Sequence, residues 1–149
     1  MTLGRFVPHP SIYIERRLAN GADLVAWAKG QGFRNLLRQT DLHATVGVAV
    51  HPIYTRPSEP APVELLIVGG ERTVVQLNHD VVALAFAAPQ LEERRRELEQ
   101  AGFQLRGPFR PHVTFAFQPS TDIDLAAPFT DPLRFGPQTS RADALGLTF

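Results

Sequence analysis

The stretch AGFQLRGPFRPHVTF, residues 101–115, is the most informative part of the sequence, because a second stretch repeats its plan. QGFRNLLRQTDLHATV, residues 31–46, also runs from a Gly-Phe pair through a loop to a His-x-Thr motif. His43 follows Gly32 by 11 positions, and His112 follows Gly102 by 10. We expect each Gly-Phe to end a helix and each motif to lie in a strand. The repeat therefore predicts two related lobes with their motifs facing a shared cleft.

The segments around this repeat predict an α+β fold. Alternating or continuous apolar runs indicate strands at 11–18, 41–50, 63–68, 72–77, 81–87, 110–117, 132–137 and 142–149. The helices are expected over 21–30, where Leu24, Trp27 and Ala28 form an apolar stripe, and over 89–101, where Pro89 begins the helix. We interpret Trp27 as a core residue. The runs at 63–68, 72–77 and 81–87 suggest a three-stranded antiparallel meander.

Length and composition limit the architecture and the partners. A chain of 149 residues with 44% hydrophobic residues fits one bilobal domain over residues 1–149. We therefore expect two pseudo-symmetric lobes of antiparallel sheet, with helices on the outside and a central cleft. Fifteen basic and 15 acidic residues give a net charge of zero, which argues against binding of duplex nucleic acid.

Other features bear on location and on metal chemistry. The sequence has no cysteine, which excludes disulfides and thiolate metal sites. The N-terminus has no apolar signal segment, and no apolar run is long enough to cross a membrane. A cytoplasmic protein without membrane contact is expected. Neither a His-x-His nor an HExxH pattern occurs, so no metal site is predicted.

Each motif places its histidine and threonine on one face of a strand, because successive side chains alternate between faces. The residues expected to share the two motif faces are His43, Thr45, Gly47 and Ala49 in the first strand, and His112, Thr114 and Ala116 in the second. Small neighbours beyond each threonine leave space for a ligand. The three other histidines, His9, His51 and His79, lie in loop or turn contexts and are expected at the surface.

Two such motifs suit acid and base catalysis at a phosphate. An imidazole has an unperturbed pKa of ~6.5, so one ring can accept a proton while the other donates one. The threonine hydroxyls can donate hydrogen bonds to phosphate oxygens as charge develops. The alternative is that these are ordinary packed side chains that match a short motif by chance. We predict His43, Thr45, His112 and Thr114 as catalytic residues with no metal or other cofactor.

These motifs resemble the two-histidine (2H) phosphoesterase superfamily, which is defined by two His-x-Thr/Ser motifs on strands of two pseudo-symmetric lobes. Within it, the chain is similar to the phage anti-CBASS phosphodiesterases, which destroy cyclic oligonucleotide signals of bacterial antiviral defence. The similarity extends over SIYIERRLANGADLVAWAKGQGF near the start, DLHATV and RPHVTF at the motifs, and PLRFGP near the end. It implies metal-independent cleavage of 3′–5′ links in cyclic di- or trinucleotides, in the cytoplasm of the bacterial host.

The resemblance also implies roles for residues outside the motifs. Tyr13 matches an aromatic residue that contacts a nucleobase, although a half-buried strand tyrosine is an equal alternative. Gln138 stands where the family commonly has an acidic residue, so base preference is open. Arg110 precedes the second motif and can pair with phosphate. Tyr13, Gln138 and Arg110 are therefore the predicted substrate-binding residues.

Two alternative functions use the same sequence features. An RNA-end enzyme that opens 2′,3′-cyclic phosphates, or one that handles 2′–5′ links as RNA-ligase-like members do, would need the same four residues. A nucleotide-binding sponge would hold the signal without cutting it, which the intact histidines and threonines argue against. The preferred cyclic nucleotide, the oligomeric state and any closure of the Pro-rich loop 51–62 stay open.

Overall fold

The computed structural model describes residues 11–49, 57–58, 63–119 and 122–143. Its strands are β1 (Ser11–Leu18), β2 (His43–Ala49), β3 (Leu65–Ile67), β4 (Arg72–Leu77), β5 (Val81–Phe86), β6 (His112–Phe117) and β7 (Leu133–Asp143). The helices are α1 (Gly21–Gly30) and α2 (Pro89–Gln100), with short 3-10 turns η1 (Gln39–Asp41) and η2 (Ile123–Leu125). The strands predicted at 11–18 and 72–77 and the helix predicted at 21–30 are confirmed with their bounds. The elements predicted at 41–50, 63–68, 81–87, 89–101 and 110–117 form over shorter ranges.

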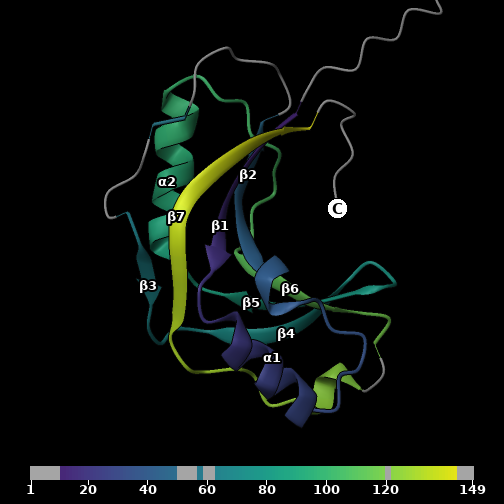
Figure 1. Cartoon of the computed structure of the whole chain (residues 1–149). Coiled ribbons are helices and arrows are strands. Elements are labelled where there is room, and N and C mark those ends of the chain that lie inside the picture. Colours follow the sequence, from purple (N-terminus) through teal and green to yellow (C-terminus); the bar gives the residue numbers. More distant parts are fainter. Residues whose placement is uncertain (1–10, 50–56, 59–62, 120–121, 144–149) are drawn as a thin grey trace, which may run out of the picture.

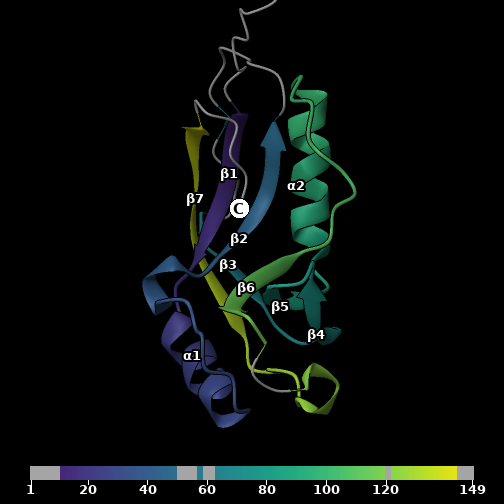
Figure 2. The ribbon, with the colours of Figure 1, turned by 90° about the vertical axis from the view of Figure 1, so that its right-hand side faces the viewer.

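All seven strands form one antiparallel sheet in the order β3-β7-β1-β2-β6-β5-β4. Its two halves join between β2 and β6, where Ala44 pairs with Val113. Figure 1 shows β1, β2 and β7 running upright while β4, β5 and β6 run across their lower end. The predicted α+β fold with two antiparallel lobes is confirmed, and the lobes are halves of a single curled sheet (Figure 2).

The internal repeat corresponds to two β-α-β units, β1-α1-β2 and β5-α2-β6. Both helices end alike, because Gly32 and Gly102 adopt φ angles of 94° and 103°, which residues with a Cβ rarely adopt. The amides of Phe33 and Phe103 then donate hydrogen bonds back to the last helical turn at 3.1 and 3.0 Å. The Gly-Phe pairs therefore end the helices, as the sequence predicts.

The loop after each helix binds the strand of the other half. Leu36, after α1, forms a bridge with Ala116 of β6, and Leu105, after α2, forms a bridge with Ala49 of β2. These loops cover the strand edges that β2 and β6 leave unpaired where they diverge. The two repeats are thus interlocked, and each motif strand is supported by both.

A β-bulge follows each motif at the same place. In β2 the register passes from Gly47 opposite Ile14 to Thr45 opposite Glu15, which leaves Val46 as the extra residue. In β6 it passes from Ala116 to Thr114, which leaves Phe115 as the extra residue. A bulge interrupts the alternation of side chains along a strand.

The bulges overturn one expectation, that Gly47, Ala49 and Ala116 lie on the same face as the motif side chains. Beyond each bulge the faces exchange, so these three residues are buried on the core side. Val48 is half-buried and Phe117 is 47% exposed, because they now share the face of the motif residues. We call this face of the sheet, which carries His43, Thr45, His112 and Thr114, the site face.

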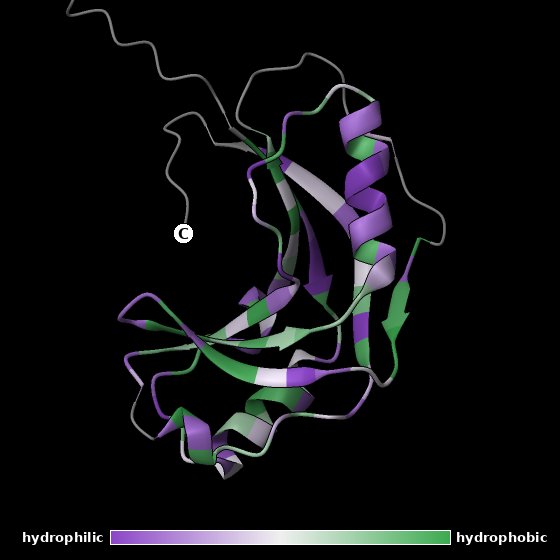
Figure 3. Cartoon of the chain, turned by 180° about the vertical axis from the view of Figure 1, so that it is seen from behind, coloured by the Kyte–Doolittle hydropathy of each residue, from purple (hydrophilic) through white to green (hydrophobic). Residues whose placement is uncertain are grey.

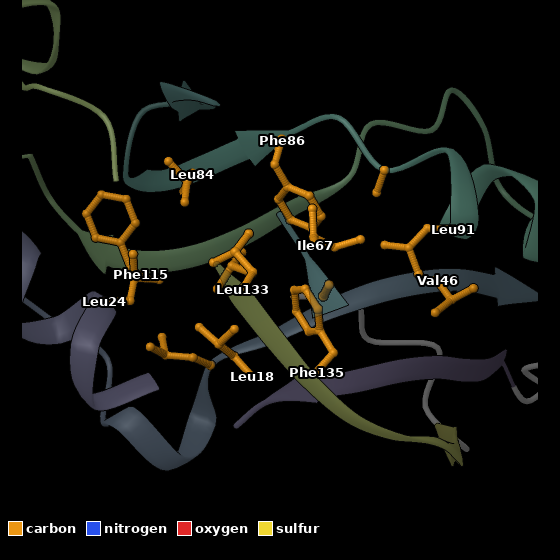
Figure 4. Close-up of a cluster of buried hydrophobic side chains, with 14 of the residues drawn as sticks. Leu18, Leu24, Val46, Ile67, Leu84, Phe86, Leu91, Phe115, Leu133 and Phe135 are labelled. Carbon is orange, nitrogen blue, oxygen red and sulfur yellow. The ribbon is translucent and has the colours of Figure 1, made fainter. Parts of the chain in front are cut away.

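The core lies on the opposite face of the sheet, against the helices (Figure 4). Leu91 and Leu98 of α2 are buried there, while the outer surface of α2 is largely hydrophilic in Figure 3. Trp27 packs its ring 5.2 Å from that of Phe115 and also contacts Phe33. Trp27 is thus partly buried and packs against the core cluster rather than inside it.

The predicted three-stranded meander is wrong, because only its second half forms. β4 and β5 make the expected hairpin, but β3 pairs with β7 at the far end of the sheet. The turn at Gly69 and Gly70, with φ of 70° and 78°, carries the chain from one half of the sheet to the other. Local turn residues cannot distinguish such a crossing from a hairpin.

Two further expectations concern the end of the chain and its loops. The strands predicted at 132–137 and 142–149 form one strand that is described up to Asp143. Pro137, which has no amide hydrogen to donate, lies in this strand where its pairing with β1 is irregular. Residues 144–149 lie outside the described residues, as do His9, His51 and most of the loop 51–62. His79 is exposed in a turn, as predicted.

Buried Arg95 of α2 holds the first bulge in place. Its guanidinium donates to the carbonyls of Val46 at 3.2 Å and Arg106 at 2.9 Å, and lies 4.4 Å from the ring centre of Phe109. Burial lowers the pKa of Arg95, an effect that nearby Glu99 opposes. The group still carries its charge, because arginine is not deprotonated in proteins. Arg95 thus ties the bulge of β2 to the loop before β6.

We expect Arg95→Met to destabilise the protein by about 1.5–3 kcal/mol, because two buried carbonyls lose a charged donor. Urea unfolding followed by circular dichroism measures this change. Arg96→Met is the matched control, since Arg96 is an exposed neighbour on the same helix and should change the free energy of unfolding by less than ~0.5 kcal/mol. Equal effects of the two substitutions would contradict the role of Arg95.

Candidate active site

The two His-x-Thr motifs lie side by side at the centre of the sheet. Ala44 and Val113, the middle residues of the motifs, are directly paired and fully buried. The histidine and threonine on either side of each middle residue therefore point to the other face. His43, Thr45, His112 and Thr114 are all half-buried. The structure thus brings the four predicted catalytic residues together from two strands distant in sequence.

Both imidazoles are held in the same way. Nδ1 of His43 lies 2.9 Å from the carbonyl oxygen of Asp41, and Nδ1 of His112 lies 2.8 Å from that of Arg110. A carbonyl oxygen can only accept, so each Nδ1 carries the proton and donates it. Each ring therefore presents Nε2 as the nitrogen available for chemistry, and both tautomers are set by the backbone two residues earlier.

A carboxylate on β1 faces the first histidine. Oε2 of Glu15 lies 3.2 Å from Nε2 of His43, and Oε1 accepts a hydrogen bond of 3.3 Å from Nε of Arg141 on β7. The Glu15 side chain is 17% exposed and that of His43 is 37% exposed, so the contact is partly shielded from water. Glu15 and Arg141 extend the site across three strands.

Tyr13 lies on the site face of β1, two residues before Glu15, and is 3% exposed. Its register partners are Val48 on β2 and Arg141 on β7. The guanidinium of Arg141 lies over the tyrosine ring, with Cζ 4.6 Å from the ring centre. The structure therefore places Tyr13 on the site face, two positions along β1 from Glu15, with the guanidinium of Arg141 over its ring.

Gln138 lies on the opposite face of the sheet. It pairs with Arg16, whereas the site-face residues of β7 pair with Glu15 and Tyr13. Its side-chain oxygen accepts a hydrogen bond of 2.9 Å from Nε of Arg94 on α2. The structure does not bring Gln138 to the histidines, and its predicted contact with a base gains no support.

Arg110 contributes to the site through its backbone, since its carbonyl orients His112. Its exposed side chain lines a surface pocket together with Thr73, Ala85 and Phe109. Ala85 is the register partner of His112, so the pocket adjoins the second motif. The predicted contact of Arg110 with phosphate stays a prediction.

Sequence reasoning missed Glu15 and Arg141 as site residues. The alternation in SIYIERRL does place Glu15 on the face of Tyr13, which was a usable signal. No local signal marks Arg141, because it reaches the site through the pairing of β7 with β1. Among the described residues, no group of three or more His, Cys, Asp or Glu side chains is placed to hold a metal ion. Neither described helix is long and apolar enough to cross a membrane.

Comparison with known families identifies the chain. The family model described as "Anti-CBASS protein Acb1" matches residues 10–142. This range contains both motifs and all of the described strands apart from Asp143, the last residue of β7. The chain belongs to the Acb1 family. The family resemblance of the motifs is thereby confirmed.

Two relatives in the Acb1 family are much longer than this chain. The anti-CBASS protein Acb1 of Caulobacter sp. (strain RHG1) is 34% identical over 140 residues, which are 88% of this chain and 22% of that protein. The anti-CBASS protein Acb1 of Sphingomonas paeninsulae is 31% identical over 147 residues, 91% of this chain and 23% of that protein. This Acb1-family chain spans less than a quarter of the length of these relatives.

The fold of this Acb1-family chain is shared with two solved structures. Escherichia coli LigT in its apo form superposes with a TM-score of 0.61 at 15% identity, over 90% of this chain and 88% of LigT. A second structure, described as a phosphoesterase, gives a TM-score of 0.59 at 15% identity, over 89% and 87% of the two chains. Both comparisons establish the two-lobed fold.

Proposed function

We propose that this Acb1-family chain is a metal-independent phosphodiesterase that cuts 3′–5′ links in cyclic di- or oligonucleotides and so counters CBASS defence. The observation that carries the proposal is the paired arrangement of two imidazoles on one face of the sheet. Each ring donates through Nδ1 to a backbone carbonyl, which leaves Nε2 for the substrate. Family membership supports the class of substrate.

The proposed reaction needs one proton acceptor and one proton donor at the same phosphate. One imidazole Nε2 accepts the proton of the ribose 2′-hydroxyl, whose oxygen forms a bond to phosphorus. The bond from phosphorus to the 5′-oxygen breaks, and that oxygen takes a proton from the other imidazole. The products of this step are a 2′,3′-cyclic phosphate and a free 5′-hydroxyl. Thr45 and Thr114 donate hydrogen bonds to the non-bridging oxygens.

The surroundings of the motifs fit a nucleotide. Arg17 and Arg141 lie on the site face of β1 and β7, where their positive charge favours a phosphate. Tyr13 offers an aromatic ring to a base if Arg141 moves aside. The pocket that Arg110 lines adjoins His112 and gives room for a second part of the ligand. We place the activity in the cytoplasm of a bacterial host, where such signals are made.

The test is an incubation of the purified chain with three classes of cyclic dinucleotide in excess EDTA, followed by chromatography of the products. The substrates are an all-3′–5′ ring, a ring with one 2′–5′ link, and the 2′-deoxy analogue of the all-3′–5′ ring. We expect the 3′–5′ links to be cut through a 2′,3′-cyclic intermediate, since the 2′-hydroxyl is the nucleophile. The 2′-deoxy ring should stay intact, and EDTA should not lower the rate.

Other outcomes point to the alternatives. Preferential cutting of 2′–5′ links, or of RNA 2′,3′-cyclic ends, would assign the chain to the RNA-ligase-like branch. Tight binding of a cyclic dinucleotide without products would make it a sponge. Activity that EDTA abolishes and added metal restores would refute the metal-free mechanism.

A further inference from the structure

The two halves of the site differ at one pair of equivalent positions. Glu15 of β1 is the register partner of Thr45, and Ala83 of β5 is the register partner of Thr114. Both partners follow the residue at which the neighbouring bulge shifts the register. The pseudo-symmetry therefore relates Glu15 to Ala83. One motif faces a carboxylate where the other faces a methyl group.

Glu15 places a carboxylate oxygen beside Nε2 of His43. Oε2 of Glu15 is buried and accepts no hydrogen bond within the described residues, so its 3.2 Å contact with Nε2 of His43 is an ion-pair contact. A proton on Nε2 would place a positive charge beside this buried carboxylate, whereas a neutral ring would leave the carboxylate charge without that partner. Because Nδ1 already donates to the carbonyl of Asp41, a proton on both nitrogens makes His43 an imidazolium.

His112 has a different environment. Its Nδ1 donates to the carbonyl of Arg110, as in the first motif. The residue equivalent to Glu15 is Ala83, which has no polar side-chain atom. Within the described residues, the first ring thus has a carboxylate beside Nε2 and the equivalent position of the second half has a methyl group.

We propose that Glu15 is a positioning residue that keeps a proton on Nε2 of His43, so that His43 acts as the acid and His112 as the base. The inference rests on the proposed function. His112 takes the 2′-hydroxyl proton, the 2′-oxygen bonds to phosphorus, and the bond to the 5′-oxygen breaks as His43 protonates that oxygen. His112 ends the step protonated and His43 neutral. Hydrolysis of the cyclic phosphate with the reverse transfers restores both.

The charged side chains around His43 agree with its proposed role as the acid. The titratable and charged side chains near the contact are Glu15 and Arg17 on β1, Arg141 on β7, Arg38 and Asp41 at η1, and His112 on β6. The carboxylate of Asp41 pairs with Arg38 at 3.0 Å, and Arg141 binds the other oxygen of Glu15. Glu15 is the carboxylate in contact with Nε2 of His43.

The test compares two leaving groups, because only a poor leaving group needs an acid. A 3′–5′ cyclic dinucleotide releases a ribose alkoxide, whereas uridine 3′-(4-nitrophenyl phosphate) releases a phenolate that needs no proton. We expect Glu15→Gln to lower kcat about tenfold on the dinucleotide and within about twofold on the nitrophenyl ester. Glu15→Asp keeps the charge and should restore part of the loss. Glu93→Gln, an exposed carboxylate change on α2, should alter neither rate.

The pH dependence gives a second readout. The wild-type rate on the dinucleotide should follow a bell-shaped profile, with the alkaline limb set by loss of the acid's proton. A carboxylate favours the protonated ring, so removing it should move the alkaline limb of Glu15→Gln to lower pH. The acid limb, set by His112, should stay in place. Equal losses on both substrates, or an unmoved alkaline limb, would overturn the role of Glu15.

Nuclear magnetic resonance of the histidine nitrogens separates this inference from the proposed function. In the chain without substrate, we expect Glu15→Gln to change the Nε2 signal of His43 and to leave that of His112 in place, because the carboxylate contacts the first ring. If the chain cuts neither substrate, the proposed function fails, while this comparison still tests Glu15. An unchanged Nε2 signal of His43 would refute the inference.

Discussion

His112→Ala is expected to lower kcat at least ~10²-fold on a 3′–5′ cyclic dinucleotide and by a similar factor on the nitrophenyl ester. The reason is that both substrates need the 2′-hydroxyl deprotonated as it attacks, whatever group leaves. His112 has its Nδ1 tied to a backbone carbonyl, so Nε2 is the acceptor that the substitution removes. Steady-state kinetics on both substrates measure the effect, and binding of the dinucleotide by calorimetry should largely persist.

The control for this variant is His79→Ala. His79 is exposed in the turn between β4 and β5, so its removal should leave both rates unchanged. A His112→Ala variant that folds and cuts the dinucleotide at a rate near that of the wild type would exclude the two-histidine mechanism. Far-ultraviolet circular dichroism establishes whether the variant is folded.

His43→Ala is expected to show the second large effect, with a different pattern. On the dinucleotide kcat should fall at least ~10²-fold, because the 5′-oxygen leaves without a proton. On the nitrophenyl ester the loss should be much smaller, since phenolate leaves unaided. The ratio of the two losses measures how far His43 serves as an acid, and the same rate assays provide it.

The opposite pattern would reverse the assignment. Suppose that His43→Ala lowers kcat by the same factor on both substrates, while His112→Ala lowers it much less on the nitrophenyl ester than on the dinucleotide. His43 would then be the base. The double variant is informative as well, because the effects of residues that act as a unit do not add. It should be little slower on the dinucleotide than either single variant.

The motif residues could be predicted because the histidine and threonine of each motif lie two positions apart in the sequence. His43, Thr45, His112 and Thr114 follow from two copies of one pattern, and the helices before them end at glycines whose role is local. The position of Glu15 could be predicted in part, since alternation in the first strand places it on the same face as Tyr13. Nothing local showed that this face turns towards His43.

Long-range pairing explains the features that local sequence patterns did not show. β3 joins β7 rather than β4, and Arg141 comes to Glu15 through the length of β7. Gln138 lies against Arg94 on the far face because its neighbour in the register is Arg16. Register partners depend on which strands meet, and a single residue of shift moves a side chain to the other face.

The repeat, the elements and the identity of the four motif residues came from the sequence, because periodicity and helix-ending glycines act over a few residues. The difference between the two halves arose in the tertiary structure. Two bulges turn Val48 and Phe117 to the site face, and strand register places Glu15 beside His43 but Ala83 beside the second motif. Such contacts join residues from separate strands, and the packing of the whole sheet sets their distances.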